Sequence, residues 1–206
     1  MVGVVLAGGQ SRRMGRDKAA LRWLLPEGEQ VTWLTHAVRR LQSCCDQVLI
    51  SGRTDQAVAA TVTVLPDDRA LNSGPVAGMA TVLSSCPGQH CLFLPVDMVR
   101  VPAETLLYMA RQAQPHAAHR ESLFPLCLQA DQATREMAWR VSESAMASER
   151  SVGALLRALG SGVNWVEGID QGQLINANSP DDLKRHELPV GPLANLVPGT
   201  EDNDHD

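Results

Sequence analysis

The sequence predicts an α/β protein built on a mostly parallel sheet. Short apolar runs that end at glycine, proline or aspartate alternate with longer segments of helical spacing, which is the pattern of such folds. With 206 residues the chain can bury a real core. A content of 44% hydrophobic and 20% charged residues is ordinary for a soluble globular protein, so neither a fibrous nor a disordered chain is expected.

Apolar runs bounded by turn residues are predicted to form the strands. The first, Val2–Leu6, is closed by Gly8-Gly9, and a later one, His90–Leu94, by Pro95-Val96-Asp97. The remaining predicted strands are Gln47–Ser51, Ala60–Leu65, Ser122–Gln129 and Val163–Glu167.

Segments of helical spacing separate these strands. On the segment Thr32–Leu41 the apolar residues share one face, and Arg39 and Arg40 are expected on the outside. The other predicted helices are Pro75–Ser84, Pro102–Gln114, Asp131–Ser144, Ser151–Leu159 and one that opens at Ser179-Pro180-Asp181-Asp182, where cap, proline and acids follow the favoured order.

Residues 1–187 are therefore expected to form a single domain. The remainder, 188–206, is rich in proline, glycine and acids and ends in "GTEDNDHD". Such a composition cannot bury enough apolar surface to fold, so a disordered acidic tail is predicted.

Charge and cysteine usage exclude several classes of protein. A net charge of −5 argues against nucleic-acid binding, which needs a broad basic face. No signal peptide is expected at the start of this sequence, and no apolar run approaches the ~20 residues of a membrane span. The five cysteines form no Cys-x-x-Cys pair, which favours reduced thiols in the cytoplasm. The six histidines are scattered, and we expect them, including the closest pair His116 and His119, to be surface residues rather than ligands.

One stretch is strongly basic, in contrast to the acidic chain around it. The segment "LAGGQSRRMGRDKAAL", Leu6 to Leu21, places Arg12, Arg13, Arg16 and Lys18 directly after the first strand. A glycine-rich loop at a strand's carboxyl end presents backbone N–H groups to phosphate. The spacing differs from a Walker A loop and from the dinucleotide fingerprint. Several cations suggest a bound polyphosphate, and the alternative is a solvated basic turn.

At four places the residues resemble the nucleotidyltransferases, and within them the molybdenum cofactor guanylyltransferases. Leu6-Ala7-Gly8-Gly9, followed by Ser11-x-Arg13-Met14-Gly15-x-Asp17-Lys18, resembles the family's signature loop. The other matches follow in family order: Gly74-Pro75-Val76-Ala77-Gly78-Met79, Leu94-Pro95-Val96-Asp97 and Asn176-Ala177-Asn178-Ser179-Pro180-Asp181-Asp182-Leu183. Together they extend from residue 2 to about 186.

This resemblance implies a fold, a reaction and substrates. The fold is a Rossmann-like three-layer sandwich with a mostly parallel central sheet, the nucleotidyltransferase fold. The implied reaction transfers GMP from GTP to the terminal phosphate of molybdopterin and releases pyrophosphate, with Mg²⁺ as cofactor. Transient contact with cofactor-delivery proteins or apo-molybdoenzymes is expected as well.

The implied reaction suggests a role for each candidate residue. Lys18 is expected at the α-phosphate, Arg13 with Arg12 at the leaving phosphates, and Asp97 as the Mg²⁺ ligand, with a loop-structuring role as its alternative. Further nucleotide contacts are expected from Leu6, Ala7, Gly8, Gly9, Ser11, Arg53, Asp67 and Gly78. Asp67 is preferred to its neighbour Asp68 because it lies seven residues before Gly74.

The acceptor site is less marked in the sequence. Asn176 and Asn178 are expected to bind the pterin, with a turn-stabilising role as the alternative for Asn178. The family often has an asparagine before the arginine where this chain has Gly52-Arg53.

Two other functions remain open at this point. A cytidylyltransferase acting on the same pterin shares the glycine signature, although Gly8-Gly9 favours guanine because those relatives tend to have an alanine there. A non-catalytic nucleotide or cofactor chaperone would share the binding residues but would show no metal-dependent turnover.

Overall fold

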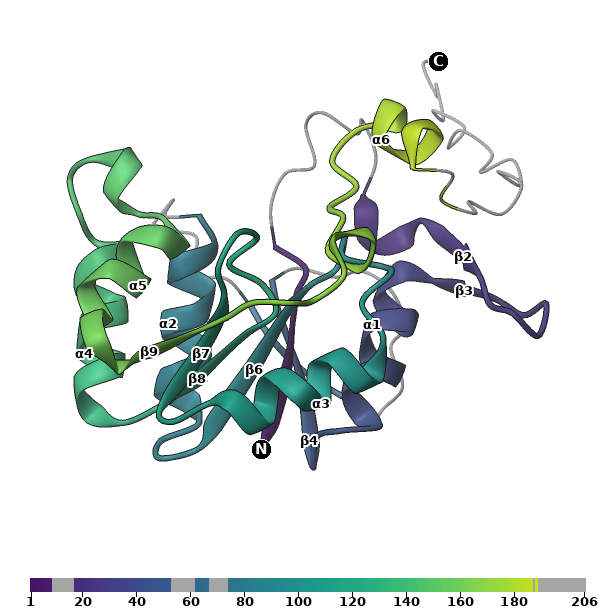
Figure 1. Ribbon diagram of the computed structural model, residues 1–206. Coiled ribbons are helices and arrows are strands. Elements are labelled where there is room, and N and C mark those ends of the chain that lie inside the picture. The colour runs from purple at the N-terminus through teal and green to yellow at the C-terminus, as the bar shows by residue number, and fades with distance from the viewer. Residues whose placement is uncertain (9–16, 53–61, 67–73, 187, 189–206) are drawn as a thin grey trace, which may run out of the picture.

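The computed structural model describes residues 1–8, 17–52, 62–66, 74–186 and 188. Its main sheet has seven strands in the order β5-β4-β1-β6-β8-β7-β9 (Figure 1). Only β8 runs antiparallel to its neighbours, which confirms the predicted mostly parallel sheet. The strands are β1 Val2–Leu6, β4 Gln47–Ser51, β5 Thr63–Leu65, β6 His90–Pro95, β7 His116–His119, β8 Leu126–Gln129 and β9 Val163–Val166.

Helices cover both faces of this sheet and complete a three-layer sandwich. One core lies under α1 (Trp33–Gln42) and α3 (Ala103–Gln112). A second core lies on the opposite face under α2 (Pro75–Ser85), α4 (Gln132–Ser142) and α5 (Val152–Leu159), which gather on one side of Figure 1. The C-terminal α6 (Pro180–Arg185) stands at the carboxyl edge of the sheet. Short 3₁₀ turns are η1 Lys18–Ala20, η3 Ala147–Glu149, η4 Gly160–Gly162 and η5 Gln171–Gln173.

Strand β1 lies at the centre and is buried on both sides. Val2 and Val4 pack into the second core and Val5 into the first. At Gly3 a Cβ atom would lie 2.9 Å from the Cβ of Leu41. Glycine at this position lets α1 approach the central strand closely.

Several elements differ from the sequence prediction. A separate hairpin, β2 (Arg22–Leu24) and β3 (Gln30–Thr32), projects from the body (Figure 1) and was not predicted. Strand β7 was also not predicted, because its sequence His-Ala-Ala-His lacks the β-branched and aromatic residues typical of strands. Strand β8 begins at Leu126, four residues later than expected.

The expected exposure of three residues was wrong. Arg40 is only 9% exposed. It lies one helical turn after His36, and both side chains face the backbone of residues 98–99, which follows β6. His116 and His119 are 4% and 2% exposed, because β7 lies between β8 and β9. Burial is also the main cause of the lowered pKa of both imidazoles.

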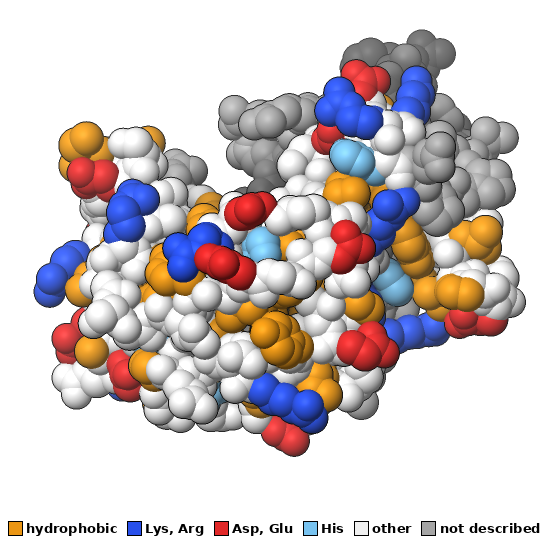
Figure 2. All heavy atoms as spheres, in the orientation of Figure 1, with side chains coloured by type: hydrophobic (Ala, Val, Ile, Leu, Met, Phe, Trp, Pro, Cys, Tyr) orange, Lys and Arg blue, Asp and Glu red, His pale blue; other side chains and the backbone are white. Residues whose placement is uncertain are grey.

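The face of the molecule in Figure 2 mixes acidic and basic side chains with hydrophobic ones between them. Among the described residues, no helix combines the length and the apolar character needed to cross a bilayer. Leu188, the first residue of the predicted tail, is buried, and residues 189–206 lie outside the described part of the chain, so the domain boundary stays a prediction.

Candidate active site

The site is built where the carboxyl ends of three parallel strands meet. The N–H of Ala7 donates to the carbonyl of Ser51 at the end of β4, at 2.8 Å, and the N–H of Val96 donates to that of Leu6, at 3.1 Å. Ligands of open α/β sheets gather at this edge. The chain that leaves β1 toward the glycine loop therefore starts in the expected place.

Gly52 allows the exits of β1 and β4 to lie against each other. Its φ is +124°, and a Cβ atom built there would lie 2.4 Å from the backbone nitrogen of Gly8. No other residue type fits that space or adopts that conformation readily. Gly52 therefore sets the direction in which the loop leaves Ala7 and Gly8.

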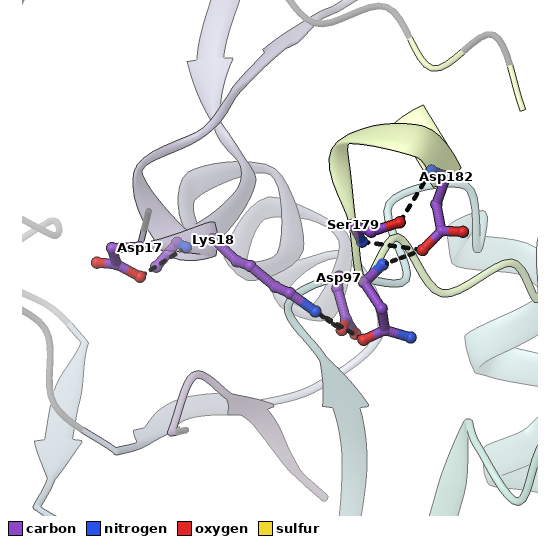
Figure 3. Close-up of polar contacts among 7 residues, drawn as sticks. Asp17, Lys18, Asp97, Ser179 and Asp182 are labelled. Atoms are coloured by element: carbon purple, nitrogen blue, oxygen red, sulfur yellow. Dashed lines mark hydrogen bonds and ion pairs between the residues drawn. The ribbon is translucent and has the colours of Figure 1, made fainter. Parts of the chain in front are cut away.

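Lys18 enters the site from the other end of the basic loop. It opens the 3₁₀ turn η1, whose N-cap Asp17 accepts a hydrogen bond from the N–H of Ala19 at 2.9 Å. Its ammonium group donates to Asp97 Oδ2 and to Asn178 Oδ1, each at 2.7 Å (Figure 3). Three segments that are remote in the sequence thus meet at one nitrogen atom.

Asp97 lies in the turn directly after β6. The side chains of Lys18 and Asp97 are only 12% and 16% exposed, so their ion pair is partly shielded from water. The carbonyl of Asp97 also accepts a hydrogen bond from the N–H of Ala177 at 3.2 Å, which joins this turn to the C-terminal segment. Coulombic attraction is stronger in such a partly buried pair than at the surface.

Asn178 is held by the cap of the last helix. Ser179 and Asp182 form a reciprocal capping box at the start of α6. The same Asp182 Oδ2 accepts hydrogen bonds from the backbone N–H groups of both Asn178 and Ser179, each at 2.9 Å (Figure 3). The bond from Asn178 is the largest cause of the lowered pKa of Asp182, so this carboxylate is charged at neutral pH.

This arrangement suits a phosphate ligand. An ammonium group has three N–H donors, and the described residues accept two from Lys18, which leaves one for a phosphate oxygen. Asp97 Oδ2 accepts from Lys18, and the structure records no hydrogen bond from a described residue to its other oxygen.

The same residues fit a divalent cation of the magnesium type. Within the described ranges no group of three or more His, Cys, Asp or Glu side chains is placed to hold a metal ion. A single carboxylate suffices for Mg²⁺, which proteins bind through one or two carboxylates together with substrate phosphates and water. Asp97 offers one such carboxylate at the carboxyl edge of the sheet.

The structure brings some of the predicted site residues together and leaves others apart. Leu6, Ala7 and Gly8 lie at the carboxyl edge, and Lys18, Asp97 and Asn178 are in contact. Asn176 is exposed two residues before Asn178, and Gly78 is buried inside α2. The predicted residues outside the described part of the chain are Gly9, Ser11, Arg12, Arg13, Arg53 and Asp67.

Two residues of the site were not predicted as functional. In the sequence, Gly52 closes the predicted strand Gln47–Ser51 and stands where the family often has an asparagine, and Asp182 belongs to a helix start and to the last family motif, but neither was assigned a role in the site. The spacing Ser-x-x-Asp from Ser179 is a capping signal that can be recognised in a sequence. The hydrogen bond from Asn178 to Asp182 adds a role that the signal itself does not reveal.

Comparisons with known proteins identify the family of this chain. Residues 3–163 match the model of the MobA-like NTP transferase domain. A molybdenum cofactor guanylyltransferase of Xanthomonas euvesicatoria is 34% identical over 191 residues, covering 91% of this chain and 95% of that protein. A probable molybdenum cofactor guanylyltransferase of Rhodopirellula baltica is 33% identical over 204 residues, covering 89% of this chain and 90% of that protein.

Solved structures share the fold at lower identity. Molybdopterin-guanine dinucleotide biosynthesis protein A of Archaeoglobus fulgidus aligns with a TM-score of 0.69 and 20% identity, over 91% of this chain and 97% of that one. The 2-C-methyl-D-erythritol 4-phosphate cytidylyltransferase of Thermus thermophilus aligns with a TM-score of 0.61 and 17% identity, over 90% and 96%. The matched domain and the similarity along nearly the whole chain show that this protein is a nucleotidyltransferase and belongs to the MobA-like NTP transferase family.

Proposed function

We propose that the protein transfers GMP from GTP to the terminal phosphate of molybdopterin and releases pyrophosphate. The observation that carries this function is the contact of Lys18 with Asp97 and Asn178 at the carboxyl edge of the sheet. The names of the Xanthomonas and Rhodopirellula relatives support guanine as the base and the molybdenum cofactor as the acceptor.

Lys18 is proposed to act on the α-phosphate of GTP. Attack by one phosphate on another brings like charges together, and a fixed cation lowers the energy of the resulting transition state. Asp97 and Asn178 hold the ammonium group in place before substrate arrives, so Lys18 itself would need little reorganisation during the reaction. Arg13, with Arg12, is proposed to hold the leaving β- and γ-phosphates through bidentate contacts.

Asp97 is the proposed Mg²⁺ ligand. Asp97 would hold the metal there, and the metal would supply positive charge that neutralises part of the phosphate charge. Asp97 also pairs with Lys18, so this one carboxylate would hold both the metal ion and the ammonium group.

The remaining predicted contacts complete the proposed substrate sites. Asn176 and Asn178 are assigned to the pterin side, since both precede α6 at the carboxyl edge. The nucleotide side is assigned to Leu6, Ala7, Gly8, Gly9, Ser11, Arg53, Asp67 and Gly78.

Substrate selectivity tests this function directly. The purified protein is incubated with molybdopterin, Mg²⁺ and either GTP or CTP, and pyrophosphate is measured together with the dinucleotide product. We expect turnover with GTP that disappears when the metal is chelated. Pyrophosphate formed only with CTP would favour a cytidylyltransferase, whose fold this chain also shares. Nucleotide binding without turnover would favour a chaperone.

We also propose that the protein works in the cytoplasm and passes its product to cofactor-delivery proteins or apo-molybdoenzymes. All five cysteines are free thiols, which is usual in a reducing compartment.

A further inference from the structure

A buried arginine lies behind the turn that carries Asp97. Arg40 projects from α1, and its Nη1 donates to the carbonyl oxygens of Met98 at 3.0 Å, Val99 at 3.3 Å and Val101 at 2.5 Å. Its Nε donates to the carbonyl of His36 at 3.3 Å. The backbone that follows Asp97 therefore curls around one guanidinium group.

Among the described residues this guanidinium has no acidic partner. None of the described Asp or Glu residues lies within ion-pair distance, and none of the described residues forms a hydrogen bond with the buried Nη2. Burial lowers the pKa of Arg40 to about 9, so the group is still charged at neutral pH. A buried cation without a carboxylate is unfavourable, and the hydrogen bonds to carbonyl groups offset that penalty only while residues 98–101 keep this shape.

His36 supports the same turn. Its Nε2 lies 3.0 Å from the carbonyl oxygen of Val99 and, because a carbonyl only accepts, this nitrogen carries the proton. Its ring stacks on Trp23 with centroids 5.4 Å apart. His36 and Arg40 are four residues apart, so both point from one face of α1 toward the same backbone.

The turn they hold is also connected to the C-terminal part of the site. Arg100, inside the turn, donates to the carbonyl of His186 just after α6. Ala177 donates to the carbonyl of Asp97 from the other side. The segment 97–101 is thus fixed by α1 on one side and by the segment that carries Asn178 on the other.

We propose that Arg40 is a positioning residue that holds residues 98–101 and thereby aims the Asp97 carboxylate at its metal ion. This inference rests on the proposed function, in which Asp97 binds Mg²⁺. Mg²⁺ demands near-ideal octahedral geometry, so a small shift of its ligand weakens binding. Outer partners of metal ligands typically contribute 10–100-fold in metal affinity or activity.

Three variants separate positioning from simple stabilisation. Arg40→Met keeps a long apolar side chain and removes every donor. Arg40→Lys keeps a group with three N–H donors, which can serve the three carbonyl groups now bound by Nη1. Arg39→Met is the matched control, since Arg39 is exposed on the same helix and, in the part of the chain that the structure describes, forms its ion pair with Glu29.

Metal dependence is the main measurement. We expect Arg40→Met to raise the Mg²⁺ concentration for half-maximal turnover by about 10-fold or more, with the KM for GTP at saturating Mg²⁺ little changed. Arg40→Lys should stay within about 3-fold of wild type, and Arg39→Met should equal it. Electron paramagnetic resonance of Mn²⁺ bound in the presence of GTP should show the same order of affinities without relying on turnover.

The outcomes test the role of Arg40 separately from the proposed nucleotidyl transfer. A wild-type protein without metal-dependent turnover would overturn the proposed function. A normal wild type with unchanged metal affinity in Arg40→Met would overturn the inference, even if that variant melts at a lower temperature. If Arg40→Met does not fold, His36→Leu, which removes one donor to Val99, replaces it. If His36→Leu needs a several-fold higher Mg²⁺ concentration for half-maximal turnover, the inference is supported. If that concentration is unchanged, the inference is overturned.

Discussion

Two ion pairs at opposite ends of the sheet have almost the same length and very different surroundings. Lys18 and Asp97 are 2.7 Å apart at the carboxyl edge, with side chains 12% and 16% exposed. The N-terminal ammonium of Met1 and Asp46 are 2.6 Å apart at the amino edge, with side chains 25% and 87% exposed. Water screens the second pair and competes for it, while the first is partly shielded.

The comparison teaches that bond length alone does not identify a functional ion pair. Lys18 of the pair at the carboxyl edge also contacts Asn178 and lies beside the strand ends, whereas Asp46 holds the start of β1 through Met1. Substitutions at both ends should therefore differ in what they change.

The largest effect is expected from Asp97→Asn. The amide keeps the size of the side chain but removes the charge that holds Lys18 and the proposed metal ion. Turnover measured as pyrophosphate release should fall by about 10³-fold. The matched control is Asp46→Asn, the same change in the exposed pair. Turnover of Asp97→Asn within about 10-fold of wild type would exclude Asp97 as an essential ligand.

A somewhat smaller effect is expected from Lys18→Met. This substitution keeps an unbranched chain and removes the cation proposed to act on the α-phosphate, so turnover should fall by about 10²-fold. Lys184→Met, at an exposed position in the last turn of α6, serves as the control. If Lys18→Met and Lys184→Met turned over at the same rate, Lys18 would have no special role in catalysis, and the ion pair at the carboxyl edge would not be functional.

The support behind Asn178 is tested by two alanine variants at the same helix cap. Asp182→Ala removes the acceptor of the Asn178 N–H, whereas Ser179→Ala removes the other half of the capping box, at a cost of about 1 kcal/mol in stability. We expect turnover to fall by about 10-fold for Asp182→Ala and by much less for Ser179→Ala. Equal turnover of Asp182→Ala and Ser179→Ala would mean that Asp182 acts only as part of the helix cap.

The pH dependence of this support has a definite sign. The pKa of Asp182 is lowered, chiefly by the hydrogen bond from the Asn178 N–H. Its stabilising effect is therefore complete above the ordinary carboxyl pKa and is lost as the pH falls through the lowered pKa. A thermal melting series in acid should show a loss for wild type that is smaller in Asp182→Ala.

The smallest effect is expected at the amino edge. The hydrogen bond between the two groups is the first cause both of the raised pKa of the Met1 ammonium and of the lowered pKa of Asp46. The pair's contribution is lost as the pH falls through the lowered pKa of Asp46, and again as it rises through the raised pKa of the amine. Asp46→Asn should leave turnover within about 2-fold of wild type. A large loss of turnover would mean that the two ends of the sheet are coupled.

Much of the fold could be predicted because its signals are local. The strand Val2–Leu6, the capped helix at Ser179 and the helix after Gly74 were predicted within a residue or two, since periodicity and capping depend on neighbours in the chain. Strand β7 was not predicted because His116–His119 shows neither a strand periodicity nor a capping signal. Its pairing with β8 and β9 makes it a strand.

Arg40 shows the same limit for a single side chain. Its position on the helix was predicted correctly, but its exposure was not, because helical periodicity gives no information about a turn some 60 residues further along the chain. The shortest hydrogen bond of Arg40 joins it to Val101, which is 61 residues away in the sequence.

The sequence by itself determined the class of the sheet, the glycine loop after the first strand, and the types of residue needed for phosphate chemistry. Only the tertiary structure decided that Lys18 meets Asp97 across 79 residues and Asn178 across 160. The physical reason is that short-range patterns specify each element, whereas the order of strands in the sheet specifies which of their ends become neighbours.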